Sequence, residues 1–139
     1  MNIRGFVMML FLVTFACATA EGGQRAYSAT LISPRAGQVL HPGQTVRVEW
    51  QATLPKLKHR VAGCEMEIWL SLDGGATFPT IITPPQIPYT STSFIWTVPN
   101  TPSNAAILDI RFGCEFYYPE TPSPQPESTF VIASEGWQN

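Results

Sequence analysis

The amino-acid sequence predicts an all-β protein with the architecture of an immunoglobulin-like antiparallel β-sandwich of about seven strands. Apolar and polar residues alternate in several short segments, and no segment carries a sustained helical repeat. Connections rich in proline and glycine separate these segments, at residues 33–44, 83–88, 99–104 and 118–126. Short strands joined by such turns, with no helices between them, favour two antiparallel sheets packed face to face.

Each predicted strand has one apolar face, as expected when a sheet buries one side against a core. In residues 45–50, for example, Val46, Val48 and Trp50 share a face, and polar residues occupy the other. Proline ends such a ladder, as Pro99 does, because it has no N–H to donate. The full set of predicted strands is residues 29–32, 45–50, 64–71, 80–83, 93–99, 106–116 and 128–132.

Two cysteines indicate how two of these strands pair. Cys64 and Cys114 are each preceded by glycine and followed by glutamate. They are the two cysteines that remain once Cys17 is removed with the export signal described below, and an even pair in an exported chain predicts one disulfide. Placing them opposite each other in an antiparallel pair matches every inward apolar residue with another, and a slip of one residue would turn one apolar set outward. The same register sets Glu67 opposite Arg111, which predicts a cross-strand ion pair on the outward face. The inward pairs are Met66 with Phe112, Ile68 with Ile110, and Leu70 with Leu108.

Residues 1–20 have the features of an export signal that is cleaved from the mature chain. Arg4 supplies a positive start, residues 6–16 form an apolar run too short for a comfortable membrane span, and small residues precede Glu21. Cleavage after residue 20 predicts a secreted protein, periplasmic or extracellular, without a stable membrane span. Lipid attachment at Cys17 is the alternative that the sequence leaves open.

The mature chain has the length of one domain. We interpret it as a flexible N-terminal segment (21–29), an immunoglobulin-like sandwich (30–133) and a C-terminal tail (134–139). The sequence has 8 basic and 10 acidic residues, and removal of Arg4 makes the balance more acidic. This argues against nucleic acid as a partner, because phosphate binding needs a clustered basic surface. His41 and His59 are isolated from other ligand residues, so neither a metal site nor a cofactor is expected.

The stretch SLDGGATF fits the pattern Ser-x-Asp-x-Gly-x-Thr-aromatic and resembles the Asp box of sialidases and related β-propellers. A propeller needs at least four blades of four strands, which one domain of this length cannot supply. In that family the motif is a hairpin-turn device remote from catalysis. We therefore expect a tight turn at residues 73–75, in which Asp73 accepts hydrogen bonds from turn N–H groups. The matching residues are Ser71, Asp73, Gly75, Thr77 and Phe78, of which the last two are expected to begin the returning strand.

One carboxylate pair raises the question of glycoside hydrolysis. Glu65 and Glu67 lie two residues apart on one strand, so both project outward about 7 Å from each other, a separation compatible with acid–base chemistry. Nothing in the sequence indicates a cleft that would raise the pKa of either carboxyl group. A solvated sheet face is the favoured interpretation, and no catalytic residue is expected.

Four segments together resemble a known family. They comprise LISPRAGQVLHPGQTVRVEWQA, CEMEIWLSLDGGATF, SFIWTVPNTPSNAAILDIRF and STFVI, which cover nearly all of residues 30–132. Their order is similar to the strands of extracellular bacterial immunoglobulin-like and fibronectin-like domains, related to the N-terminal domain of the yeast cell-wall Kre9 and Knh1 proteins. The resemblance implies a noncatalytic module of larger secreted or wall-associated proteins. This sequence differs from that pattern in standing alone, in its paired Gly-Cys-Glu motifs and in its proline-rich loop before the last strand.

These observations favour an exported noncatalytic module for binding or structural roles at the cell envelope or outside the cell. Its expected partner is a protein or a cell-envelope glycan. A first alternative is a small carbohydrate-binding protein that uses the aromatic side chains of Trp69, Tyr117 and Tyr118. A second alternative is a secreted enzyme inhibitor that acts through loops such as residues 54–60.

Overall fold

The structure is a computed structural model that describes residues 26–57, 63–85 and 87–136. The predicted signal peptide, the alternative lipidation site Cys17 and residues 21–25 lie outside the described residues. Among the residues that are described, no helix is long and apolar enough to cross a membrane. The described secondary structure consists of strands and one short 3-10 helix, η1 (Pro126–Ser128).

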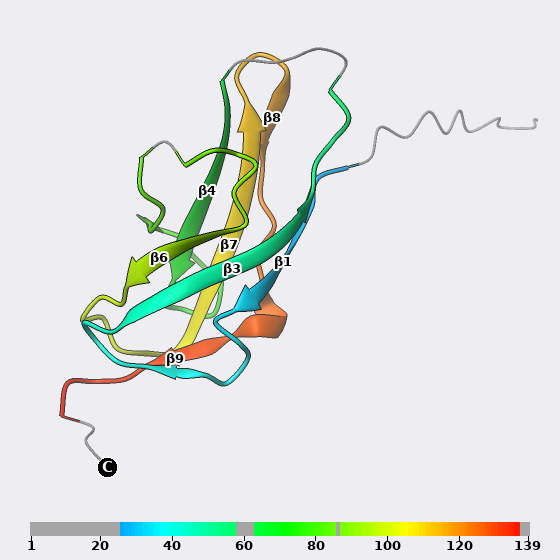
Figure 1. The fold of residues 1–139 in the computed structure, drawn as a ribbon. Coiled ribbons are helices and arrows are strands. Elements are labelled where there is room, and N and C mark those ends of the chain that lie inside the picture. Colours follow the sequence, from blue (N-terminus) through cyan, green and yellow to red (C-terminus); the bar gives the residue numbers. More distant parts are fainter. Residues whose placement is uncertain (1–25, 58–62, 86, 137–139) are drawn as a thin grey trace, which may run out of the picture.

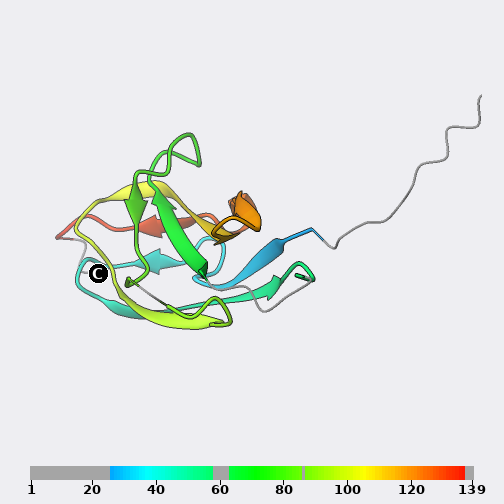
Figure 2. The ribbon, with the colours of Figure 1, turned by 90° about the horizontal axis from the view of Figure 1, so that it is seen from above.

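Two sheets form a sandwich, which Figure 1 shows from the side and Figure 2 from above. The smaller sheet has the order β1-β3-β6, with β1 (Ser28–Ser33), β3 (Thr45–Thr53) and β6 (Ser93–Thr97). The larger sheet has the order β2-β9-β7-β4-β5, and β8 pairs with β7. Its strands are β2 (Val39–Leu40), β4 (Cys64–Ser71), β5 (Thr80–Ile81), β7 (Ser103–Cys114), β8 (Tyr118–Thr121) and β9 (Phe130–Ile132).

The predicted all-β sandwich is confirmed, with nine strands in the described part of the chain rather than about seven. The two additional strands, β2 and β8, are short and lie within segments that the sequence marks as loops. The sandwich is also not wholly antiparallel, because β2 pairs with β9 in parallel. A glycine-containing connection leads from β1 into β2 and places that short strand beside β9.

The core lies between the two sheets and is built from the apolar faces that the alternation predicts. Trp50 of β3 is 1% exposed, and its indole Nε1 lies 3.0 Å from the sulfur of Met66 in β4. This contact gives the one polar atom of the indole a partner inside the core. The predicted inward residues of β4 and β7 are all buried: Met66, Ile68, Leu70, Leu108, Ile110 and Phe112.

The predicted register of β4 and β7 is confirmed at every position. Cys64 lies opposite Cys114, and the two form a disulfide within one sheet. Glu67 lies opposite Arg111 as expected, but the predicted ion pair between them is wrong. Arg111 bonds to Asp109 (2.6 Å) and Glu120 (3.1 Å) instead. Asp109 lies two residues away on the same strand face and is buried, so it competes better for the guanidinium than a solvated glutamate.

The sandwich begins earlier than the expected boundary at residue 30. Tyr27 is buried, and its hydroxyl donates a hydrogen bond to the carbonyl oxygen of Ile110 at 2.9 Å. Its ring packs against Phe112, with 5.4 Å between the ring centroids. Burial, and then the negative charge of Asp109, raise the pKa of the Tyr27 hydroxyl above its ordinary value of 10.0. The residues just before β1 therefore belong to the core, and the predicted flexible segment does not extend this far.

Removal of the disulfide should destabilise the fold strongly. The bond joins cysteines 50 residues apart in the sequence. In the chain-entropy account, closing a loop of that length stabilises the folded state by about 4 kcal/mol. We expect a Cys64→Ser/Cys114→Ser variant to lose about that much free energy of unfolding in urea titrations. A variant as stable as the oxidised parent would contradict this role for the disulfide.

Candidate functional site

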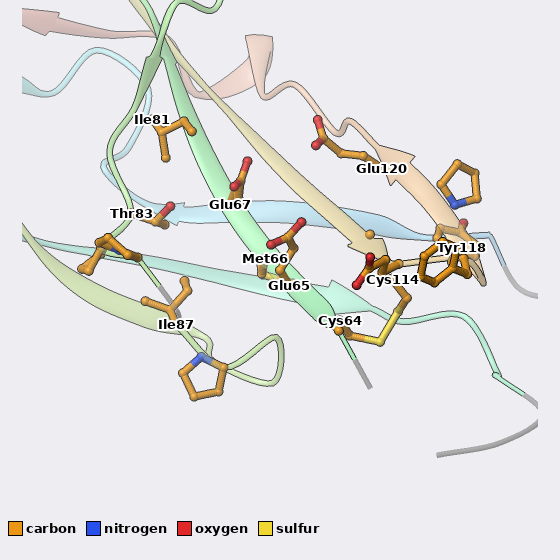
Figure 3. Close-up of a pocket in the computed structure, with 18 residues that line it drawn as sticks. Cys64, Glu65, Met66, Glu67, Ile81, Thr83, Ile87, Cys114, Tyr118 and Glu120 are labelled. Carbon is orange, nitrogen blue, oxygen red and sulfur yellow. A yellow bond between two sulfur atoms is a disulfide. The ribbon is translucent and has the colours of Figure 1, made fainter. Parts of the chain in front are cut away.

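An open groove of about 980 Å³ runs along the edge of β4, between the loop at residues 83–88 and the β7–β8 hairpin. This volume is at the upper end of the range for small-molecule pockets. Figure 3 shows Glu65 and Glu67 projecting from β4, with Glu120 on the hairpin side and the disulfide at one end. The lining residues are Gly63 to Glu67, Ile81, Thr83 to Pro85, Ile87, Pro88, Gly113 to Phe116, and Tyr118 to Glu120.

One wall of the groove exists because proline ends the pairing at the edge of β4. β5 pairs with β4 at only two positions, and the Ile82 N–H then donates to the Ile68 carbonyl at 2.8 Å. The next residues are Pro84 and Pro85, which cannot donate to a ladder. The chain therefore leaves the strand edge and returns only at an isolated bridge between Glu65 and Pro88.

The opposite wall is the β7–β8 hairpin, which the sequence did not predict. The strand expected over residues 106–116 ends at Cys114, and residues 118–121 form β8 rather than part of a proline-rich loop. Gly113 permits this hairpin, because a Cβ there would lie 3.0 Å from the backbone Cα of Glu120. The Tyr117 N–H donates to the Cys114 carbonyl at 3.1 Å and closes the turn. The glycine of the second Gly-Cys-Glu motif thus serves a close strand approach.

The charge of the groove is uniformly negative. The only charged side chains among the described residues that line it are Glu65, Glu67, Glu115 and Glu120, and none of these lining residues is Lys, Arg or His. Glu67 accepts a hydrogen bond from the indole Nε1 of Trp69 at 3.0 Å, and Glu120 accepts one from Arg111.

Glu65 and Glu115 are exposed carboxylates of the groove for which the described residues provide no side-chain partner. Within the part of the chain that the structure describes, neither side chain makes a hydrogen bond or an ion pair.

Phe116 lies at the rim of the groove in an unfavourable backbone conformation. Its φ is 64°, and among the described residues it alone has a positive φ without being glycine. It occupies the third position of the turn from Cys114 to Tyr117, where a positive φ favours Gly or Asn. Its side chain is 93% exposed, so no packing within the domain compensates. Sequence reasoning missed Phe116 because the expected strand ran through it.

The three aromatic residues proposed for carbohydrate binding do not form one surface. Trp69 lies on the outward face of β4 as expected, but the guanidinium of Arg111 stacks 4.5 Å from its ring centroid. Tyr118 packs on Phe112, with 5.6 Å between the ring centroids, and its hydroxyl accepts the Tyr27 N–H. Tyr117 is 64% exposed at the hairpin, at the opposite end of the β4–β7 ladder from Trp69.

A buried carboxylate organises the outward face beside the groove. Asp109 is 1% exposed, and it accepts hydrogen bonds from Arg111 at 2.6 Å and from the Ser123 N–H at 2.8 Å. Burial of Arg111 lowers its pKa, but the hydrogen bonds and negative charges of Asp109 and Glu120 outweigh this and raise the pKa above its ordinary value. Arg111 therefore remains charged and fixes Glu120 at the groove. The alternation pattern gave no signal that Asp109 is buried on an outward face.

The turn motif after β4 is a network of side-chain and backbone hydrogen bonds. Asp73 accepts from the Thr77 N–H at 2.9 Å, from the Thr77 hydroxyl at 2.6 Å and from the Ser71 hydroxyl at 2.6 Å. The Ser71 oxygen in turn accepts the Gly75 N–H at 2.8 Å. Gly74 and Gly75 both have a positive φ, as the sequence predicts. The returning strand begins at Thr80, so the expectation that Thr77 and Phe78 begin it is wrong.

Two further hypotheses from the sequence concern a metal site and an inhibitor loop. Among the described residues, no group of three or more His, Cys, Asp or Glu side chains could hold a metal ion. His59 lies outside the described residues, as do residues 58–60 of the loop that the inhibitor hypothesis uses.

Acid should weaken the turn after β4 in a defined pH window. The hydrogen bonds from Ser71, and then those from Thr77, lower the pKa of Asp73 from 3.8 to about 2. Because the folded state favours the ionised form, this contribution is complete above about pH 4 and is lost as the pH falls towards 2. We expect Asp73→Ala to be less stable than the parent at pH 7, with the difference narrowing between pH 4 and 2 in urea titrations. Equal stability at pH 7 would contradict this role for Asp73.

Replacement of Phe116 by glycine should stabilise the domain. An L-residue in the left-handed region costs about 1–2 kcal/mol, while glycine costs about 0.5–1 kcal/mol in chain entropy. Since the exposed ring loses no burial, we expect Phe116→Gly to raise the free energy of unfolding by about 0.5–1 kcal/mol. Urea titration measures this change, with Tyr117→Ala as the control for loss of an exposed aromatic side chain. A loss of stability in Phe116→Gly would show that the ring packs within the domain.

No protein-family model matches this sequence, and no curated protein matches it at a significant level. The site is therefore interpreted from its own geometry.

Proposed function

We propose that this chain is an exported, noncatalytic immunoglobulin-like module that binds a partner protein through the groove beside β4. The observation that supports this most directly is the groove itself, which combines unpaired carboxylates with a strained, exposed aromatic side chain. Strained residues persist where the surrounding structure holds them, and they concentrate at functional sites. Exposed apolar side chains bordered by polar ones are typical of protein interaction surfaces.

The groove is better suited to binding than to catalysis. Hydrolysis by paired carboxylates needs one carboxyl group whose pKa is raised by an enclosed, apolar environment. Glu65 is exposed on the solvent side of the groove, and Glu67 is held by the indole N–H of Trp69. Neither Glu65 nor Glu67 therefore lies in an apolar enclosure.

Export is supported by the disulfide and by the sequence of residues 1–20. Disulfides persist in oxidising compartments such as the periplasm and the extracellular space. The Cys64–Cys114 bond, and the finding that no described helix could cross a membrane, are compatible with a secreted protein. Membership of the bacterial extracellular immunoglobulin-like domains remains part of this proposal, based on the resemblance of the strand motifs.

Site-specific photocrosslinking tests the proposed function. A photoreactive amino acid replaces Pro119, which is exposed and lines the groove, or Gln51, which is exposed on β3 of the opposite sheet. The mature protein is irradiated with the extracellular fraction of its own organism, and adducts are identified by mass spectrometry. We expect a discrete protein adduct from position 119 that is absent from position 51.

The proposal is overturned if no protein adduct forms from position 119, and also by any of three other outcomes. The first is the same set of adducts from both positions, and the second is adducts with glycan only. The third is hydrolysis of chromogenic glycosides that is abolished by Glu65→Gln or Glu67→Gln, because this would make the groove an active site.

A further inference from the structure

The chemistry of the groove also indicates which kind of protein segment it fits, and this inference rests on the proposed function. Four of the ten acidic residues of the chain line this one groove, and no basic side chain is among its described lining residues. A groove lined by one sign of charge concentrates oppositely charged ligands and repels those of the same sign. Nucleic acids, anionic lipids and anionic polysaccharides are therefore disfavoured, and a cationic ligand is favoured.

The four carboxylates of the groove can contact more than one cationic group of a ligand. Glu65 lies on β4, between the two walls, and Glu115 lies on the hairpin turn, and among the described residues neither carboxylate has a hydrogen-bond or ion-pair partner. Glu67 and Glu120 are each held by a single donor, from Trp69 and Arg111 respectively. A carboxylate has about four lone-pair sites, so even these two can accept further hydrogen bonds. A ligand that contacts the carboxylates of both β4 and the hairpin would need several cationic groups.

The apolar residues of the groove indicate that the ligand is more than a small cation. Prolines from both walls and the ring of Phe116 contribute apolar surface. Neither the 93% exposure of Phe116 nor its positive φ stabilises the isolated domain. An aromatic side chain of this kind serves as an anchor when a partner covers it.

We propose that the groove binds an extended protein segment in which lysine or arginine residues alternate with apolar residues. An extended chain projects successive side chains to opposite sides. Alternation therefore supplies both kinds of side chain along the groove: cationic ones for Glu65 and Glu115, and apolar ones for Phe116 and for the prolines of the two walls. Exposed charge pairs of this type contribute modestly, and they act mainly on the association rate and on specificity.

Fluorescence anisotropy with synthetic peptides tests this inference on the mature, oxidised protein. The probe is a labelled peptide in which arginine alternates with valine and tyrosine. A peptide with glutamate in place of arginine and unlabelled spermine as a competitor are the comparisons. We expect the arginine peptide to bind and the glutamate peptide not to bind. Raising the salt should weaken binding, since the Debye length falls from about 30 Å at 0.01 M to about 3 Å at 1 M.

Matched variants locate the binding. Glu65→Gln/Glu115→Gln should weaken binding of the arginine peptide by about fivefold to tenfold, as expected for two exposed charge contacts. Glu127→Gln/Glu135→Gln changes the net charge equally at exposed positions outside the groove and should leave the affinity unchanged. Phe116→Gly should weaken binding without loss of stability, whereas Tyr117→Ala, next to it but outside the groove lining, should have no effect.

The inference is overturned if both glutamate pairs weaken binding equally, because the attraction would then depend only on net charge. It is also overturned if the glutamate peptide binds as tightly as the arginine peptide, or if spermine at equal charge concentration displaces the arginine peptide completely. A loss of affinity in Tyr117→Ala equal to that in Phe116→Gly would overturn it as well. Groove-specific protein adducts in the crosslinking experiment, without binding of the arginine peptide, would leave the proposed function standing and remove the cationic partner. Absence of protein adducts would remove the proposed function itself.

Discussion

The pairing of β4 with β7 is the interaction on which the rest of the structure depends. Because side chains alternate between the faces of a strand, the register decides which residues lie on the inward face of the sheet and which lie on the outward face. The observed register buries residues such as Ile68 and Ile110 between the sheets and turns Glu65 and Glu67 outward. A shift of one residue would bury those carboxylates without partners, which is costly in an apolar core. The disulfide holds this register at the end of the pair where the groove lies.

The groove arises where regular pairing stops on either side of that ladder. On one side the prolines after Thr83 cannot continue the edge of β4, and on the other side Gly113 allows β8 to approach closely. Between these walls β4 presents the carboxylates of Glu65 and Glu67 on its outward face. Asp109 has a different role, since its buried charge holds Arg111 and thereby sets the position of Glu120. The acidic residue that is buried in this sheet is thus distinct from the exposed glutamates of the groove.

Much of the fold could be predicted because its causes are local or pairwise. Alternation identified the main strands, and two cysteines in equivalent contexts were enough to align β4 with β7. The candidate site was predicted far less well. Two of its glutamates, Glu65 and Glu67, were recognised only as a solvated face. Phe116 was assigned to a strand because an aromatic residue with positive φ at the third position of a turn breaks the usual turn preferences. The predicted Glu67–Arg111 ion pair is wrong because the register defines which residues are neighbours, but not which of several carboxylates is buried and pairs with the guanidinium.

The sequence by itself determined the all-β class, the inward residues, the disulfide and the glycine-rich turn held by Asp73, since each follows from periodicity, spacing or short-range hydrogen bonding. Only the tertiary structure decided that Tyr27 belongs to the core and that Asp109 is buried on an outward face. It likewise decided that an acidic groove lies between two segments distant in the sequence. These features depend on which segments meet across the sandwich. Such tertiary contacts are set by the packing of whole sheets, which no local sequence pattern encodes.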